Sequence, residues 1–175
     1  MKPKDFVKKI LHVRSNDDPV EQVRRLREKG VVIGENVHIY NSYIDSDYSS
    51  LIQIGSNVTI TNATILAHDA STKKFIGYTR VGKVTIGNNV FIGYGSIILP
   101  ETIIGDNIII GAGTVVKGKI PSDSVIVGNP WKILCSTDDY IAKNKSALSE
   151  STIYDKVLDK ERMGKELGTK KGFIL

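Results

Sequence analysis

The sequence predicts a mainly β protein, a solenoid of short parallel strands, because one pattern recurs at a fixed six-residue interval. An aliphatic residue stands at every sixth position from Ile86 to Val116, and glycine follows it in four of the six repeats. A period of six fits neither an amphipathic helix nor simple strand alternation. It fits a chain that turns a corner after each short strand, so that three repeats close one triangular coil and the coils stack by parallel pairing. The aliphatic positions are Ile86, Ile92, Ile98, Ile104, Ile110 and Val116.

The expected corners carry the residues that tolerate a left-handed backbone, namely glycine, asparagine and aspartate. The same pattern begins near Ile33, blurs between Asn41 and Gln53, and resumes at Ile54. Between Leu66 and Ile86 it is interrupted again, which indicates a loop projecting from one corner over residues 72–83. The corner residues are Gly87, Asn88, Asn89, Gly93, Gly105, Asp106, Asn107 and Gly111.

These patterns divide the chain into three parts. Residues 1–30 are expected to form a helical cap, with one short helix over 3–13 and a second that begins at Asp18-Pro19 and ends at Gly30. The β-helix is expected over residues 31–134. Residues 135–175 are expected to hold two short helices, at 138–145 and 150–162, and a lysine-rich tail.

Composition limits the classes of function. The single cysteine, Cys135, cannot form an internal disulfide, the start of the chain has no apolar signal region, and no stretch approaches the roughly 18 apolar residues of a membrane span. We therefore expect a cytoplasmic protein. The net charge of +5 falls mainly in the terminal segments, without the interleaved aromatic residues that stack on bases, so no nucleic-acid site is expected.

His68 is the residue best placed for chemistry. It is one of three histidines in the chain, and it lies in the segment Ile65-Leu-Ala-His-Asp69 at the corner where the projecting loop departs. Acyl transfer from a thioester to a hydroxyl requires a base within hydrogen-bonding reach of that hydroxyl, and neutral imidazole suits this task near pH 7. A loop histidine without a role is the alternative.

Several segments together resemble the hexapeptide-repeat acyltransferases, in particular the branch of sugar O-acetyltransferases that includes the maltose, galactoside and surface-polysaccharide enzymes. The resemblance spans roughly residues 31–134. It implies a left-handed parallel β-helix, a homotrimer, acetyl-CoA as co-substrate, a sugar hydroxyl of a polysaccharide or its precursor as acceptor, and His68 as general base. The matching segments are Ile65–Asp69, Val84–Gly93, Ile97–Pro100, Ile110–Val116, Ile120–Ser124 and Val127–Pro130.

The resemblance also indicates which residues contact the two substrates. An asparagine and an aspartate of the irregular early coils face the acceptor, and the pantetheine arm lies between two subunits along main-chain groups. Asp69 either orients His68 or faces solvent, and Phe91 either faces the sugar or packs against a neighbouring subunit. The expected acceptor contacts are Asn41, Asp45, Asp47, Asp69, Tyr78, Arg80 and Phe91, and the expected coenzyme contacts are Gly93, Ser96, Gly111, Ala112, Lys117 and Lys132.

Two other functions stay open at this stage. The same fold and donor serve N-acetylation of an amino sugar on a nucleotide carrier, and a non-catalytic β-helix could act as a scaffold. Trp131, where the family usually has a small residue, leaves the contacts at the adenine end open. Covalent catalysis through Cys135 has no support from a neighbouring histidine, and no metal is expected, because the zinc-binding relatives need a pair of histidines five residues apart and His68 has Lys73 at that offset.

Overall fold

The computed structural model describes residues 18–149, 151–154, 163 and 172–174. The chain forms two compact units, residues 1–134 and 135–175. The helix expected over residues 3–13 lies outside the described residues.

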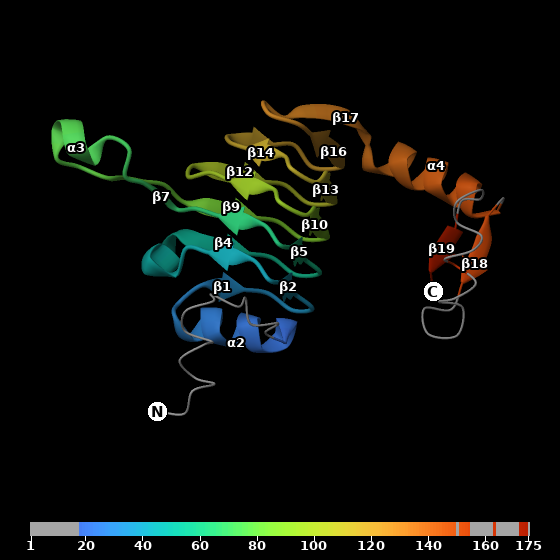
Figure 1. Cartoon of the computed structure of the whole chain (residues 1–175), viewed down its shortest axis with the longest axis horizontal. Coiled ribbons are helices and arrows are strands. Elements are labelled where there is room, and N and C mark those ends of the chain that lie inside the picture. Colours follow the sequence, from blue (N-terminus) through green and yellow to red (C-terminus); the bar gives the residue numbers. More distant parts are fainter. Residues whose placement is uncertain (1–17, 150, 155–162, 164–171, 175) are drawn as a thin grey trace. The chain divides into compact units, whose positions relative to one another are not determined.

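The first unit is a stack of coils whose strands fall into three sheets, visited in turn, and the strands of successive coils pair parallel within each sheet (Figure 1). The first sheet contains β1 (Val32–Ile33), β4 (Ile52–Ile54), β9 (Val84–Ile86), β12 (Thr102–Ile104) and β15 (Lys119–Ile120). The second contains β2 (His38–Tyr40), β5 (Thr59–Thr61), β10 (Val90–Ile92), β13 (Ile108–Ile110), β16 (Ser124–Val127) and β17 (Lys132–Ser136). The third contains β3 (Tyr43–Ile44), β6 (Thr64–Ile65), β11 (Ile97–Ile98) and β14 (Val115–Val116).

Each sheet sends a column of aliphatic side chains into the core at the positions that the six-residue period predicts. Strand register places the members of a column directly above one another, and every one of them is at most 9% exposed. Burial of each such side chain is worth about 1.5–3 kcal/mol, so the columns are the main source of stability. The columns are Ile33, Ile54, Ile86, Ile104 and Ile120; Ile39, Ile60, Ile92, Ile110 and Ile126; and Ile44, Ile65, Ile98 and Val116.

A ladder of side-chain amides runs up the corner between the first and second sheets. Each asparagine there has a positive φ, between 54° and 57°, and its Nδ2 donates to the side-chain oxygen one coil further along. The last donation, from Asn107 to Asp123, measures 2.7 Å. The ladder consists of Asn36, Asn57, Asn89, Asn107 and Asp123.

Glycine at the same corner is required by the close approach of successive coils. A Cβ on Gly87 would lie 2.6 Å from the carbonyl oxygen of Gly105 and 2.5 Å from Asp106 Oδ1. The backbone N–H of the following residue, Asn88, donates to that same Oδ1 at 2.6 Å. The corner therefore admits no side chain at Gly87.

Helix α2 (Pro19–Glu28) lies beside the first coil, where the sequence predicted a cap (Figure 1). The Asp18 side chain accepts a hydrogen bond from Val20 N at 3.0 Å, and Gly30 follows the helix with a φ of 96°. Val23 and Leu26 are buried, and both belong to the same core cluster as the coil aliphatics. The helix thus covers apolar surface that would otherwise be open at this end of the stack.

Two insertions leave the stack at one corner, the corner that follows the third sheet. The first is the 3-10 helix η1 (Ser46–Leu51), which accounts for the blurred repeat between Asn41 and Gln53. The second is an arm in which β7 (His68–Asp69) and β8 (Arg80–Val81) pair antiparallel and α3 (Lys73–Ile76) forms the projecting end (Figure 1). The projecting loop expected over residues 72–83 is therefore present, and it contains a short helix.

The second unit begins with α4 (Thr137–Ser149), where the sequence predicted a helix over 138–145. Strand β18 (Thr152–Tyr154) follows and pairs parallel with β19 (Gly172–Ile174). The helix expected over 150–162 is therefore wrong at residues 152–154, and the rest of it lies outside the described residues. Thr152 and Ile153 are β-branched, which favours the extended backbone that the pairing requires.

We expect Gly87→Ala to lower the free energy of unfolding by about 3 kcal/mol, because the added methyl group meets backbone and carboxylate oxygens that cannot move without separating two coils. Gly95→Ala is the matched control. Gly95, unlike Gly87, has a positive φ, of 72°, and a Cβ there meets nothing within 4 Å, so backbone strain of about 1–2 kcal/mol is its whole cost. Urea unfolding of the two variants measures the difference, and equal losses would contradict the close-approach argument.

Candidate functional site

His68 is held by a buried carboxylate at the corner where the arm begins. Its Nδ1 donates a hydrogen bond to Oδ2 of Asp45, and the backbone N–H of Ala67 donates to the same oxygen at 3.1 Å. Asp45 is fully buried, whereas the His68 side chain is 30% exposed. Because a carboxylate only accepts, Nδ1 carries the proton, and Nε2 is left with a lone pair that can accept another.

The coil register brings Asp45 to this place. Ile44 pairs with Ile65, and Asp45 N donates to Ile65 O at 3.0 Å, so Asp45 lies one coil below the segment that leads into His68. Its second oxygen, Oδ1, is buried without a hydrogen-bond partner among the described residues. A buried carboxylate oxygen without a partner costs free energy. Asp45 therefore has one oxygen that accepts from Ala67 N and His68 Nδ1, and one oxygen whose burial is not offset by a hydrogen bond.

Tyr48 of η1 packs beside the imidazole. The ring centroids of Tyr48 and His68 are 4.7 Å apart and the rings are inclined by 32°. Tyr48 also contacts the hydrophobic core, so its ring position is fixed from the other side. Tyr48 is not among the site residues expected from the sequence, because only polar residues of the irregular segment between Asn41 and Gln53 were expected to face the acceptor.

Asp69 makes a separate set of contacts on the arm. Strand register places it opposite Arg80, whose Nη2 lies 3.2 Å from Asp69 Oδ2, and Ser71 N donates to Asp69 Oδ1 at 2.9 Å. Hydrogen bonds from Ser71 and the charges of Arg80 and Lys117 hold the pKa of Asp69 below its ordinary value. The suggestion that Asp69 orients the imidazole is therefore wrong, since Asp45 does so.

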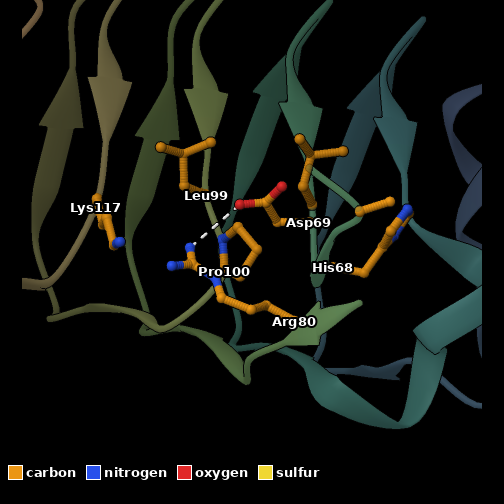
Figure 2. Close-up of a pocket in the computed structure, with 8 residues that line it drawn as sticks. His68, Asp69, Arg80, Leu99, Pro100 and Lys117 are labelled. Carbon is orange, nitrogen blue, oxygen red and sulfur yellow. Dashed lines mark ion pairs between the residues drawn. The ribbon is translucent and has the colours of Figure 1, made fainter. Parts of the chain in front are cut away.

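A cavity of about 400 Å³ opens beside these residues (Figure 2). His68 and Lys117 stand at opposite ends of the row of lining side chains, with Asp69, Arg80 and Leu99 between them. The lining combines an apolar wall with a few charged groups, as is usual for small-molecule sites. The lining residues are Leu66, His68, Asp69, Ala70, Arg80, Leu99, Pro100 and Lys117.

The expected acceptor contacts are only partly brought together in one chain. Asp69 and Arg80 line the cavity, and Asp45 lies buried behind His68, so its expected direct contact with the acceptor is replaced by the bond to His68. The other four do not line the cavity of a single chain. Asn41 is exposed at the corner between β2 and β3, Asp47 is exposed on η1, Tyr78 is 76% exposed on the arm, and Phe91 is 43% exposed on the outer face of β10.

The expected coenzyme contacts fall at two different corners. Gly93, Gly111 and Ala112 stack at the corner between the second and third sheets, where a Cβ on Gly93 would lie 2.7 Å from Ala112 N. Ser96 is buried there, and its hydroxyl donates to Gly111 O at 3.0 Å, which leaves no free side chain for a ligand. Lys117 lies instead on the wall of the His68 cavity, and Lys132 is exposed on β17.

The described residues include no cluster of three or more histidine, cysteine, aspartate or glutamate residues that could hold a metal ion. None of the helices in the described ranges has the length and apolar character needed to cross a lipid bilayer.

Known proteins are similar to this chain over most of its length. The bacterial transferase hexapeptide pattern, with six repeats, matches residues 83–118. Protein CapG of Staphylococcus aureus is 41% identical over 143 residues, which cover 77% of this chain and 80% of CapG. The chain belongs to the bacterial hexapeptide transferase family. Its fold class, the parallel β-helix of that family, is the one predicted from the sequence.

Two further members of the hexapeptide transferase family bear on the chemistry. A galactoside acetyltransferase, solved in complex with coenzyme A, has a TM-score of 0.54 and 28% identity over 77% of this chain and 80% of that one. A dTDP-4-amino-4,6-dideoxy-D-glucose acyltransferase of Escherichia coli is 32% identical over 73% of this chain and 72% of that protein. The two relatives are thus named for a galactoside and for a nucleotide-linked amino sugar, and this chain is an acyltransferase of sugar-related substrates.

We expect Ser71→Ala to raise the pKa of Asp69 toward its ordinary 3.8, and to raise it more than Lys117→Met does, because the Ser71 side chain is the largest cause of the lowering. A carboxyl-carbon NMR titration measures both shifts. Since the folded-state pKa is depressed, the contribution of Asp69 to stability is present above pH 3.8 and is lost as the pH falls through the lower folded value. An Asp69 that titrates at its ordinary pKa in the unaltered protein would contradict the contacts described.

Proposed function

We propose that this protein is an acetyl-CoA-dependent O-acetyltransferase that modifies a hydroxyl of a sugar, within a polysaccharide or its precursor, with His68 as general base. The observation that carries the proposal is the hydrogen bond between His68 Nδ1 and the buried Asp45, at the edge of a cavity of suitable size. That bond fixes the tautomer in which Nε2 accepts a proton. Membership of the hexapeptide transferase family supports the acyl-transfer chemistry.

The reaction is a direct transfer. His68 Nε2 takes the proton of the acceptor hydroxyl as the oxygen attacks the thioester carbonyl carbon. A main-chain N–H stabilises the oxyanion that forms, and Asp45 stabilises the imidazolium. The carbon–sulfur bond then breaks, the thiolate leaves, and His68 returns the proton to the sulfur. The products are the acetylated sugar and coenzyme A, and His68 is again neutral.

The active site is completed by a second subunit of a homotrimer. A pantetheine arm lying along Gly93, Gly111 and Ala112 would be at a different corner of the coil from His68 of the same chain. A neighbouring copy that brings its glycine corner to His68 resolves this separation. The outer faces of the second and third sheets, which meet at that corner, expose several aromatic side chains suited to burial between subunits. These are Tyr40, Tyr43, Phe91 and Tyr94.

N-acylation of a nucleotide-linked amino sugar is the second candidate, because the E. coli relative that is 32% identical is named an acyltransferase of a dTDP-linked amino sugar. An amine acceptor is mostly an ammonium ion at neutral pH and must lose a proton before it attacks. A hydroxyl oxygen has a lone pair even while it is protonated, so it can lose its proton to His68 during the attack and not before it. Turnover confined to amino sugars would therefore select this candidate.

We expect His68→Ala to lower kcat by about 10²–10⁴-fold while acetyl-CoA still binds, because the base is lost and the coenzyme contacts are not. Asp45→Asn should lower kcat by about 10²-fold or more, since an amide can donate to Nδ1 and reverse the tautomer. Thiol release from acetyl-CoA, with hydroxyl sugars, amino sugars and nucleotide sugars as acceptors, measures both effects. Glu35→Gln, which alters an exposed carboxylate away from the cavity, is the control and should retain activity.

Unchanged kcat in the His68 variant would exclude the general-base role. No turnover with any acceptor, together with no acetyl-CoA binding by calorimetry, would leave a β-helix that acts as a scaffold.

We expect two inactive variants to restore each other's activity when their subunits are mixed. His68→Ala removes the base, and Ala112→Trp fills the exposed glycine corner where the coenzyme is proposed to lie. Random mixing in equal amounts should recover about a quarter of the unaltered activity, because about three quarters of the trimers are mixed and each of these contains one intact site out of three. Co-expressed chains, with the trimer mass checked by light scattering, test this. If each site lay within one chain, mixing would restore nothing.

A further inference from the structure

A tyrosine ring lies against the imidazole of His68. The ring centroids of Tyr48 and His68 are 4.7 Å apart and the two planes are inclined by 32°, so the rings meet by their faces more than by their edges. The hydrogen bond to Asp45 holds the imidazole at one atom, Nδ1, and by itself leaves the ring free to turn about that atom. A flat side chain against the ring face removes this freedom. Asp45 and Tyr48 together therefore set the direction in which Nε2 points.

The first insertion is what brings Tyr48 to the imidazole. The chain takes ten residues from Ile44 to Ile54, two members of the core columns, whereas the uninterrupted corner takes six, from Ile98 to Ile104. The four extra residues belong to η1, which contains Tyr48. Because Ile44 lies one coil below the segment that leads into His68, the insertion lets a residue of the lower coil reach a side chain of the upper one.

The insertion is anchored on both sides. The Ser49 hydroxyl donates to the carbonyl oxygen of Lys29 at the end of α2, and Lys29 Nζ donates to Ser46 Oγ at 3.1 Å. Tyr48 and Leu51 are partly buried and pack against the hydrophobic core. The phenol ring is thus held between the core and the imidazole, as a residue that positions a reacting group must be.

The face of the phenol ring favours the protonated form of the base. An aromatic face carries partial negative charge and attracts a cation that lies within about 6 Å of its centroid. In the proposed reaction His68 is neutral at the start and becomes cationic as it takes the proton of the acceptor hydroxyl. The attraction to Tyr48 is therefore stronger in the transition state than in the ground state, and an interaction of this kind raises kcat.

The charged groups near His68 do not replace this contact. Asp45 accepts from the Nδ1–H, which lies in the plane of the imidazole, so its carboxylate leaves the ring faces uncovered. Asp69 and Arg80 pair with each other at 3.2 Å, and Lys117 stands at the opposite end of the cavity lining (Figure 2).

We propose that Tyr48 is a positioning residue of the active site, which fixes the plane of the His68 imidazole and stabilises its protonated form through the face of the phenol ring. The inference rests on the proposed acetyltransferase function and adds a residue of the first insertion to that site. The role belongs to the ring and not to the hydroxyl, so phenylalanine should replace tyrosine here.

The first test needs no acceptor. The pH at which His68 is half protonated is read from its Hε1 signal in a proton NMR titration of the full chain, with His68→Gln to assign the signal. Tyr48→Leu should move this midpoint to lower pH by about half a unit, because leucine keeps the contact apolar but offers no aromatic face to the imidazolium. Tyr48→Phe should leave the midpoint in place. Leu51→Ala, which removes packing from the same insertion without removing a ring, should also leave it in place.

The second test measures acetyl transfer. Tyr48→Leu should lower kcat about tenfold, with the KM for acetyl-CoA changed by less than about twofold, because the ring acts on the base and not on the coenzyme. The acid limb of the pH profile of kcat/KM should move by the same half unit as the NMR midpoint. Tyr48→Phe should restore most of kcat. Tyr140→Leu, the same substitution on α4, is the control and should retain full activity.

The outcomes separate this inference from the proposed function. An unchanged NMR midpoint in Tyr48→Leu overturns the inference, and so does a Tyr48→Phe variant as slow as Tyr48→Leu, which would assign the role to the hydroxyl. Acetyl transfer that requires His68 but is unaffected by Tyr48→Leu would keep the proposed function and refute the inference. A shifted midpoint in a protein that transfers acetyl to no acceptor would keep the effect of Tyr48 on His68 and refute the acetyltransferase proposal.

Discussion

The constraint on which the structure depends is the close approach of successive coils at the corner between the first and second sheets. Gly87 and Gly105 leave no room for a side chain there, and Asn88 N bonds directly to Asp106 of the next coil. This contact holds the parallel strands in register. Because register is constant along the stack, the aliphatic columns meet without slip, and a polar residue placed at any corner has a defined neighbour one coil away.

Because the register is constant, a few residues are enough to assemble the site around His68. Asp45 and His68 are separated by 23 residues and by the η1 insertion, yet they are joined because they follow Ile44 and Ile65, which are paired in adjacent coils. Tyr48 approaches the imidazole from the first insertion, and Arg80 approaches Asp69 within the second. The rigid coil thus supplies the base and its partner, and the two insertions at one corner supply the surroundings.

The sequence predicts the regular parts of this protein well, and it predicts the irregular parts poorly for a physical reason. The six-residue period specifies which side chains point inward, so the core columns and the corner glycines follow from it. The Asp45–His68 bond does not, since the number of residues in the first insertion decides which coil position Asp45 occupies. The pairing of Ile44 with Ile65 places Asp45 beside Leu66, and the departure of the arm from the coil then brings His68, two residues further on, to the carboxylate. The strand at Thr152–Tyr154 depends on pairing with residues 172–174, which lie far along the chain. The polar composition of residues 150–162 is compatible with a helix, so the sequence does not indicate this strand.

The asparagine ladder has a direction. Asn57, Asn89 and Asn107 each donate an N–H to the coil ahead and accept one from the coil behind. Asp123 accepts from Asn107 and, as a carboxylate, has no N–H to donate. The ladder therefore has a terminus defined by one atom, because an oxygen of Asp123 stands where each earlier member has its amide nitrogen. The corner of the last coil accepts a side-chain hydrogen bond from the coil before it and offers only acceptor oxygens beyond.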